Sequence, residues 1–222
     1  MTGFPFEGVV FDVDGVLFNT ERLMHQIWHE IGAEMGWPQP GRDYLEYVGN
    51  GRSVIYEKML ALYGPSFPKE DFLQRCSQRL QERMEREGVP LKPGVRELFD
   101  FLRARNVPIA IATSTAAVRT NRRMEMTGLD RYLSAAITGD QVARGKPDPE
   151  IYLLACKALG TDPSRTLAVE DSRNGILSAS AAGMPTVMIP DMIPPAPELE
   201  ALLYNRFDSL SDLRNALDRA AF

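Results

Sequence analysis

The stretch that most constrains the fold is 8–20, where a short apolar run is followed directly by two aspartates and a glycine. Residues 9–11 are β-branched and aromatic, the composition of a strand buried on both faces. Side chains two residues apart on a strand point to the same side, so Asp12 and Asp14 can share one site. Gly15 then allows a sharp turn.

Two carboxylates placed so close together repel each other. At about 4 Å the repulsion is about 4 kcal/mol at an effective dielectric of 20, so a fold that keeps them there usually supplies a cation. The alternative is a capped strand end with two solvated aspartates. Residues elsewhere in the chain decide between these interpretations.

Polar and charged side chains also follow or flank the ends of other predicted strands. Residues 107–112 and 166–169 are predicted strands, and residues 135–138 form a weaker candidate. The side chains in question are Thr113, Lys146, Glu170 and Asp171. Strands that alternate with helices predict an α/β fold with a doubly wound parallel sheet, whose active groups lie at the carboxyl ends of the strands. We therefore expect these side chains to gather at one edge of the sheet.

Residues 20–88 differ from the rest of the chain because they show helical periodicity and no strand. Apolar residues recur at helical spacing in two stretches, 23–35 and 72–84. This pattern predicts a second, smaller, all-helical domain at 20–88, inserted into an α/β core made of 1–19 and 89–222.

With these motifs in this order, the chain resembles the haloacid dehalogenase superfamily of aspartate-nucleophile phosphotransferases, in its β-phosphoglucomutase-like phosphatase branch. The likeness covers nearly the whole chain. It implies a Rossmann-like core, a helical cap domain inserted after the first strand, and hydrolysis of a small phosphorylated metabolite, with sugar phosphates as the expected class.

The resemblance also implies roles for individual residues. Asp12 would attack phosphorus to give an aspartyl-phosphate, and Asp14 would act as general acid and then as general base. The Thr113 hydroxyl and the Ser114 amide would bind the phosphoryl group, and Lys146 would neutralise charge. The alternatives are a helix cap for Thr113 and a surface position for Lys146.

A magnesium site is the family expectation for the cofactor. Its ligands would be the carboxylate of Asp12, the backbone carbonyl of Asp14 and the carboxylate of Asp171, with Glu170 assisting directly or through water. The alternative for Glu170 and Asp171 is an N-terminal cap of the following helix, where acids are favoured.

Two arginines of the helical domain match positions that bind substrate in the family. Arg52 matches a phosphate- or carboxylate-binding arginine, and Arg79 matches, less securely, a lysine that faces the site. The alternative for both is surface charge.

Four other functions compete with hydrolysis. Dehalogenases and phosphonatases depart from this pattern at the second aspartate, so Asp14 argues against both. β-Phosphoglucomutases carry a histidine four residues after the threonine that corresponds to Thr20, where this chain has Met24; His25 lies about 100° further round the helix. A sugar phosphomutase is thus the alternative, and a non-catalytic protein that binds an anionic ligand comes third.

Composition limits the partners. The net charge of -5 argues against binding to nucleic acid. No run of about 20 apolar residues occurs, which argues against a membrane partner. Without a basic or apolar leader, we expect a cytoplasmic protein, and we expect it to be a monomer. The two cysteines lack metal-ligand spacing, and with only two histidines we expect no zinc site.

Overall fold

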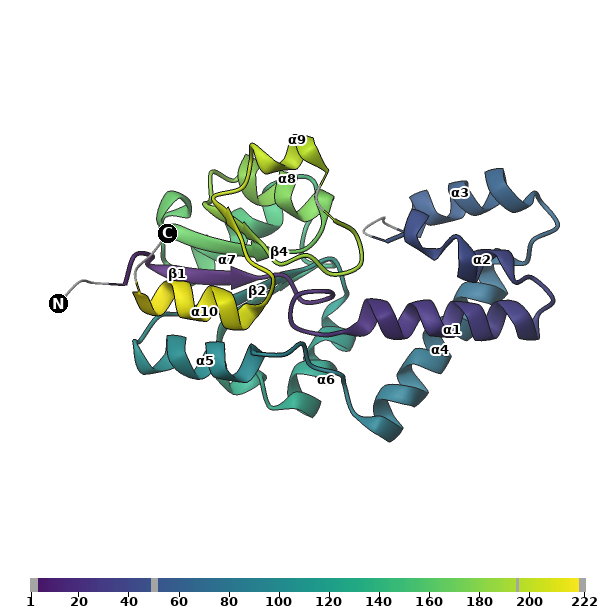
Figure 1. The fold of residues 1–222 in the computed structure, drawn as a ribbon, viewed down its shortest axis with the longest axis horizontal. Helices are drawn as coiled ribbons and strands as arrows, with labels where there is room; N and C mark the ends of the chain where they lie inside the picture. The colour runs from purple at the N-terminus through teal and green to yellow at the C-terminus, as the bar shows by residue number, and fades with distance from the viewer. Residues whose placement is uncertain (1–3, 49–51, 195, 220–222) are drawn as a thin grey trace. The chain divides into compact units, whose positions relative to one another are not determined.

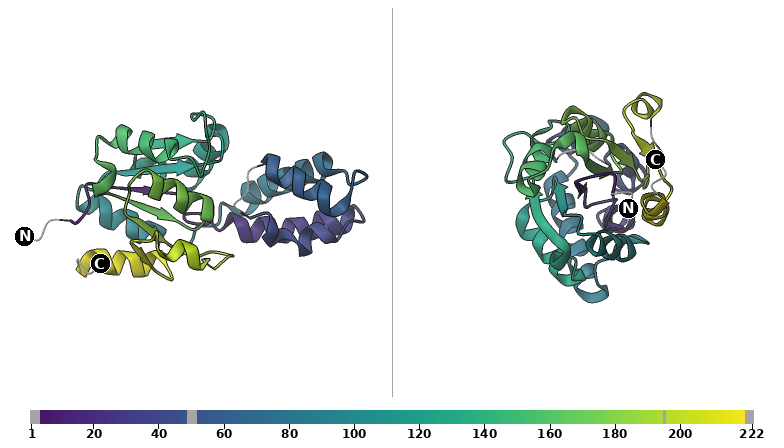
Figure 2. Two further views of the ribbon diagram at one scale, coloured as in Figure 1. Left: turned by 90° about the horizontal axis from the view of Figure 1, so that it is seen from above. Right: turned by 90° about the vertical axis from the view of Figure 1, so that its left-hand side faces the viewer.

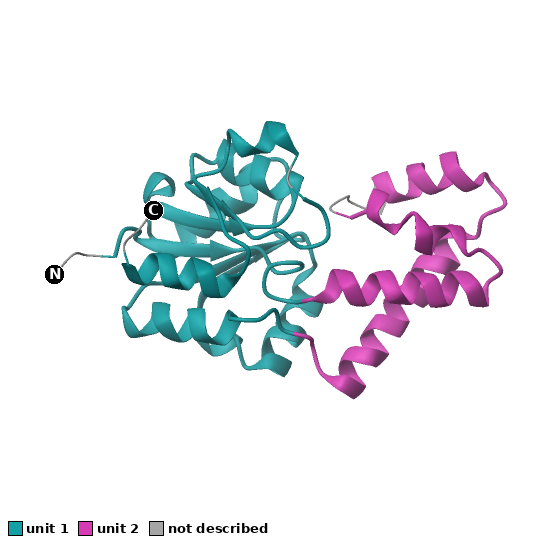
Figure 3. Ribbon diagram, viewed as in Figure 1, with its two compact units in different colours: residues 1–18, 91–222 teal, residues 19–90 magenta. Residues whose placement is uncertain are grey.

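The computed structural model describes residues 4–48, 52–194 and 196–219. The chain divides into two compact units, one made of Met1–Phe18 with Leu91–Phe222 and the other of Asn19–Pro90 (Figure 3). The boundaries expected from the sequence differ from these by one or two residues. Each unit is described by itself below.

The first unit is built on a six-stranded, all-parallel sheet with the order β3-β2-β1-β4-β5-β6 (Figure 1). Its strands are β1 (Gly8–Phe11), β2 (Ile109–Thr113), β3 (Leu133–Thr138), β4 (Thr166–Glu170), β5 (Thr186–Met188) and β6 (Asn205–Arg206). The predicted doubly wound α/β fold is confirmed. Strand β1 lies between β2 and β4, at the point where the strand order reverses, and this is where such sheets bind ligands.

Helices cover both sides of the sheet (Figure 2). They are α5 (Val95–Ala104), α6 (Ala117–Thr127), α7 (Glu150–Leu159), α8 (Arg173–Ala181), α9 (Pro197–Glu200) and α10 (Leu210–Arg219), with 3-10 turns at Asp130–Tyr132 and Pro163–Arg165. Helix α7 packs against β1, β2 and β3, and α8 packs against β4 and β5. The sequence predicted the longer elements but missed β6 and α9, which are too short to show a period.

Small side chains on the sheet bring α7 close to it. Val10 lies between Ala110 and Ala168 on the neighbouring strands, and all three belong to a buried cluster that also contains Tyr152 of α7. Because alanine adds little thickness to this face, the large Tyr152 ring has room between α7 and the sheet, where it is fully buried. This packing fixes the start of α7, and hence the loop before it.

The second unit contains only helices and turns in the part of the chain that the structure describes. These are α1 (Thr20–Glu34), α2 (Gln39–Arg42), a 3-10 turn at Tyr44–Glu46, α3 (Arg52–Tyr63) and α4 (Lys69–Glu87). Trp28 of α1 packs edge-to-face against Phe72 of α4 with ring centroids 5.1 Å apart. The predicted apolar stripe of α4 is confirmed, since Phe72, Cys76, Leu80 and Met84 are all buried.

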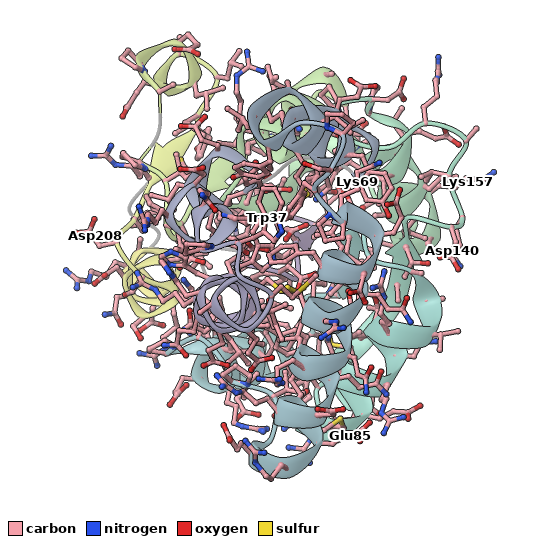
Figure 4. All side chains as sticks on the ribbon, turned by 90° about the vertical axis from the view of Figure 1, so that its right-hand side faces the viewer. Trp37, Lys69, Glu85, Asp140, Lys157 and Asp208 are labelled. Atoms are coloured by element: carbon pink, nitrogen blue, oxygen red, sulfur yellow. The ribbon has the colours of Figure 1, made fainter. Side chains whose placement is uncertain are left out.

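Long charged side chains of both signs populate the exterior. Exposed examples are Glu85 and Lys157, which project from the ribbon in Figure 4. Across the described ranges, no helix has the length and apolar character needed to cross a membrane.

The aromatic contact beneath β1 gives a test of the fold. Phe11 and Phe99 of α5 are fully buried with ring centroids 5.1 Å apart. We predict that Phe99→Ala lowers the free energy of unfolding by about 3–5 kcal/mol, because it leaves a cavity under the central strand. Urea denaturation measures this change. The control Leu153→Ala, at a side chain 43% exposed on α7, is expected to stay within about 0.5 kcal/mol of the native chain. An equal loss in both variants would contradict this description of the core.

Candidate active site

The carboxyl ends of the three central strands carry the predicted site residues. Asp12 follows β1, Thr113 ends β2, and Glu170 ends β4 with Asp171 next to it. The amide of Asp12 donates to the carbonyl of Val169 at 2.9 Å, so the parallel pairing continues one residue beyond β1. The sheet thereby holds the Asp12 side chain in a buried position between its two neighbours.

Lys146 links the ends of all three strands. Its ammonium nitrogen donates to Asp12 Oδ1 at 2.6 Å, to Glu170 Oε1 at 2.5 Å and to the carbonyl oxygen of Ala112 at 3.0 Å. The side chain is only 6% exposed. The sequence predicted that Lys146 lies with the acids at one edge of the sheet, and the structure brings it into contact with two of them.

The loop that carries Lys146 is closed by its own hydrogen bonds. The carboxylate of Glu150, at the start of α7, accepts from the amides of Ala143 and Arg144 at 2.9 and 3.0 Å. The carbonyl of Asp148 accepts from the Ser178 hydroxyl of α8 at 2.5 Å. Two helices thus fix the loop that delivers the ammonium group.

Glu170 is fully buried and has both carboxylate oxygens occupied. Oε1 accepts from Lys146 and, at 2.8 Å, from the Tyr152 hydroxyl. Oε2 accepts from the amides of Asp171 and Ser172 at 3.0 and 3.2 Å and from the Ser172 hydroxyl at 3.1 Å. The backbone of Gly175 lies so close to this carboxylate that any Cβ there would collide with it.

Ser172 occupies the N-cap position of α8. Its hydroxyl accepts from the amide of Gly175 at 3.1 Å. Glu170 and Asp171 precede this position, so neither is the N-cap residue that the alternative expects.

Tyr152 is a site residue that sequence reasoning missed. Burial raises the pKa of its phenol well above the ordinary value, and the charges of Glu170 and Asp12 raise this pKa further. The phenol therefore stays protonated and donates to Glu170. No sequence signal identifies it, since a tyrosine on the buried face of a helix normally belongs to the core.

The charges in this cluster do not balance. Burial raises the pKa of Asp12 to about 8, with the Glu170 carboxylate adding to the effect and Lys146 opposing it. Burial lowers the pKa of Lys146, but the charges of Asp12 and Glu170 outweigh that effect and hold it above its usual value. Two carboxylates thus face one ammonium group, and a proton or a bound cation has to supply the missing positive charge.

Three of the four predicted metal ligands lie close enough to share an ion. Asp12, Glu170 and Asp171 each offer a carboxylate oxygen within 4.8 Å of the others. Gly15 lies directly against the Asp171 carboxylate, where a Cβ would collide. The donors are all oxygens, the ligand type that Mg²⁺ prefers. The residues present therefore fit a magnesium ion.

The Asp14 carboxylate is held by donors from other parts of the core unit. The Thr115 hydroxyl donates to Oδ2 at 2.8 Å, and Arg123 of α6 donates to Oδ1 at 2.7 Å. Sequence reasoning identified neither Arg123 nor Thr115 as a site residue. Arg123 is one of three arginines at positions 119, 122 and 123, and nothing in the sequence shows which one points inward.

Thr113 is buried at the end of β2, and its hydroxyl accepts from the amide of Thr115 at 3.1 Å. Ser114, between them, is exposed. The first amide of α6, that of Ala117, donates instead to Asp140 at 3.0 Å. The capping alternative for Thr113 is thus wrong, and the turn 113–115 is left facing the site residues.

Of the two arginines predicted to bind substrate, the structure describes the side chain of Arg79 alone. The Arg52 side chain lies outside the described residues. Arg79 of α4 donates to Glu34 of α1 at 3.1 Å and lies 3.5 Å from Glu30. This ion pair on the surface is the arrangement that the alternative expects, and a substrate role for Arg79 stays a prediction.

The fold and the site define an α/β enzyme that works at the carboxyl edge of a parallel sheet. Residues 6–183 match the haloacid dehalogenase-like hydrolase family, and the chain belongs to that family.

Its relatives include enzymes that act on phosphate esters. The phosphorylated carbohydrates phosphatase of Thermotoga maritima is 33% identical over 181 residues, 80% of this chain and 82% of that protein. Among solved structures, a HAD family hydrolase from Deinococcus radiodurans with bound phosphate and sodium has a TM-score of 0.81 at 30% identity, covering 98% of this chain and 97% of the other. A mutant CbbY from Rhodobacter sphaeroides in complex with xylulose-(1,5)bisphosphate has a TM-score of 0.76 at 27% identity, covering 94% and 96%.

The unbalanced charge gives a prediction for cation binding. Because the pKa of Asp12 is about 8 without a cation, Mg²⁺ has to displace a proton at lower pH but not above that value. We predict that the apparent Kd for Mg²⁺ falls by up to about tenfold per pH unit as pH rises toward the pKa, and then levels off. Isothermal titration calorimetry in buffers of different ionisation enthalpy measures the affinity and the protons released together. A pH-independent affinity with no proton release would contradict it.

Proposed function

We propose that the protein is a magnesium-dependent phosphatase that hydrolyses a small phosphorylated metabolite through an aspartyl-phosphate on Asp12. The observation that carries the proposal is the state of the Asp12 carboxylate. Lys146 holds Oδ1, whereas no described residue donates a hydrogen bond to Oδ2. One oxygen is thus fixed while the other is left to act as the nucleophile.

The neighbouring groups suit the phosphoryl group that would arrive. Lys146, held between Asp12 and Glu170, would offset the negative charge of the transferring group. The buried Thr113 hydroxyl and the amide of the exposed Ser114 would donate to its oxygens. Asp14, two residues beyond the nucleophile, would protonate the departing oxygen and then take a proton from the water that hydrolyses the intermediate.

The contacts of Glu170 refine the expected metal ligands. Asp12, Asp171 and the backbone carbonyl of Asp14 would hold Mg²⁺, which when bound offsets the repulsion between the phosphate dianion and the attacking carboxylate. Both oxygens of Glu170 are already occupied by Lys146, Tyr152 and the start of α8. We therefore assign Glu170 chiefly to holding Lys146, with any effect on the cation transmitted through water.

Sugar phosphates are the substrate class that we propose. The phosphatase of Thermotoga maritima is named for phosphorylated carbohydrates, and the CbbY structure holds a sugar bisphosphate. The helical unit also contains a cavity of about 210 Å³ whose lining includes Met24, Trp28 and Tyr44.

Met24 offers no proton-transfer group at the position where β-phosphoglucomutases have histidine, and this favours hydrolysis over the mutase alternative.

The test is phosphate release from a panel of sugar phosphates and small phosphorylated acids, with magnesium or EDTA. We predict magnesium-dependent release that Asp12→Asn lowers by at least about 1,000-fold, because the amide removes the nucleophile without changing its shape. The matched control Asp208→Asn, at an exposed aspartate, is expected to keep the native rate.

The other outcomes separate the alternatives. Conversion of glucose 1-phosphate to glucose 6-phosphate without free phosphate would establish the mutase. The absence of any turnover across the panel and with p-nitrophenyl phosphate would favour the binding protein. Native rates for Asp12→Asn would show that another group is the nucleophile.

A further inference from the structure

The Asp14 carboxylate is held by two donors from different parts of the core unit. We propose that Arg123 and Thr115 are positioning residues that fix the Asp14 carboxylate for proton transfer to the leaving group. The proposal rests on the proposed function, in which Asp14 is the general acid and base. It concerns two residues whose side chains contact neither the nucleophile nor Lys146.

The geometry gives each carboxylate oxygen its own donor. Arg123 Nη1 lies 2.7 Å from Oδ1 of Asp14, and the Thr115 hydroxyl lies 2.8 Å from Oδ2. Both distances are short, as expected for hydrogen bonds to a charged acceptor. Asp14 precedes Gly15, which has a φ of +90°. With a donor on each oxygen, rotation of the carboxylate at this turn is restrained in both directions.

The burial of Arg123 is explained by its contact with Asp14. Its side chain is 9% exposed, whereas Arg119 and Arg122 on the same helix are exposed. Burying a guanidinium group costs free energy that an apolar residue of similar size avoids, so a buried arginine seldom serves packing alone. The ion pair with Asp14 gives Arg123 a partner inside the core.

Thr115 ties Asp14 to the turn that would hold the phosphoryl group. Its amide donates to the Thr113 hydroxyl at 3.1 Å, and its carbonyl accepts from the amide of Gly139 at 3.2 Å. The backbone of Thr115 is therefore fixed relative to the end of β2. Through its hydroxyl, the group that delivers the proton and the group that binds the phosphoryl oxygens belong to one hydrogen-bonded unit.

This arrangement predicts a dependence on the leaving group. An alkoxide is too basic to depart without a proton, so its rate depends on where Asp14 lies. The p-nitrophenolate anion departs readily without that help. Misplacing Asp14 should therefore slow hydrolysis of an alkyl phosphate far more than that of p-nitrophenyl phosphate. A substitution that only loosens the fold would slow both alike.

The experiment measures kcat and KM with p-nitrophenyl, phenyl and benzyl phosphate, three esters that share a ring but differ in the basicity of the leaving group. We expect Arg123→Met and Thr115→Val to lower kcat/KM, which reports the step in which the leaving group departs, by about 10- to 100-fold for benzyl phosphate relative to p-nitrophenyl phosphate. Thr115→Ser, which keeps the hydroxyl, should restore the native ratio. Arg119→Gln, at an exposed arginine of the same helix, should leave the ratio unchanged.

A second comparison shows whether the residues act through Asp14. In an Asp14→Asn background, adding Arg123→Met should change the ratio no further, because the group that Arg123 positions is already gone. Circular dichroism checks that each variant is folded. If Arg123→Met does not fold, the test is made with the near-isosteric Thr115→Val alone.

Two results would overturn the proposal. If the native chain turns over all three esters and the variants show the native ratio, Asp14 does not depend on these donors. If the native chain hydrolyses neither these esters nor any member of the panel of sugar phosphates and small phosphorylated acids, the proposed function fails and this assignment fails with it.

Discussion

The Lys146 ammonium group, buried between Asp12 and Glu170, is the interaction on which the site depends. It contacts residues from the ends of β1, β2 and β4, so it fixes the distances between three strand ends at once. It also leaves one negative charge uncompensated, because two carboxylates face a single cation. A site with this deficit holds a proton when empty and favours a divalent cation when one is available. The proposed metal binding and the proposed activation of Asp12 therefore depend on the same charge.

The rest of the core unit places the partners of that lysine. Small residues on β1, β2 and β4 let α7 lie close to the sheet, and α7 supplies Tyr152 to Glu170. Helix α8 begins against the Glu170 carboxylate because Gly175 has no side chain there. On the other side of β1, α6 and the turn before it supply the donors to Asp14. Asp12 and Asp14, the proposed nucleophile and the proposed acid, thus have separate hydrogen-bonding partners, although they lie two residues apart.

The sequence predicted those features that follow from a local pattern. Alternating strands and helices gave the parallel sheet, and strand ends gave the positions of Asp12, Thr113, Glu170 and Asp171. Sequence patterns did not reveal contacts that depend on tertiary structure. Tyr152 looks like an ordinary core residue, and Arg123 looks like one of several surface arginines until the direction of α6 is known. The sequence also could not predict that both carboxylate oxygens of Glu170 accept hydrogen bonds, since the donors come from three different elements.

The proposed function depends on covalent phosphorylation of the Asp12 carboxylate, and trapping the aspartyl-phosphate is the direct test of this step. Borohydride added during turnover reduces an acyl phosphate to an alcohol, so it converts a phosphorylated aspartate into homoserine. Mass spectrometry of the digested protein then locates the change. We predict homoserine at position 12, formed only while substrate and magnesium are present. Phosphate release with unmodified Asp12, or with the change at another residue, would contradict it.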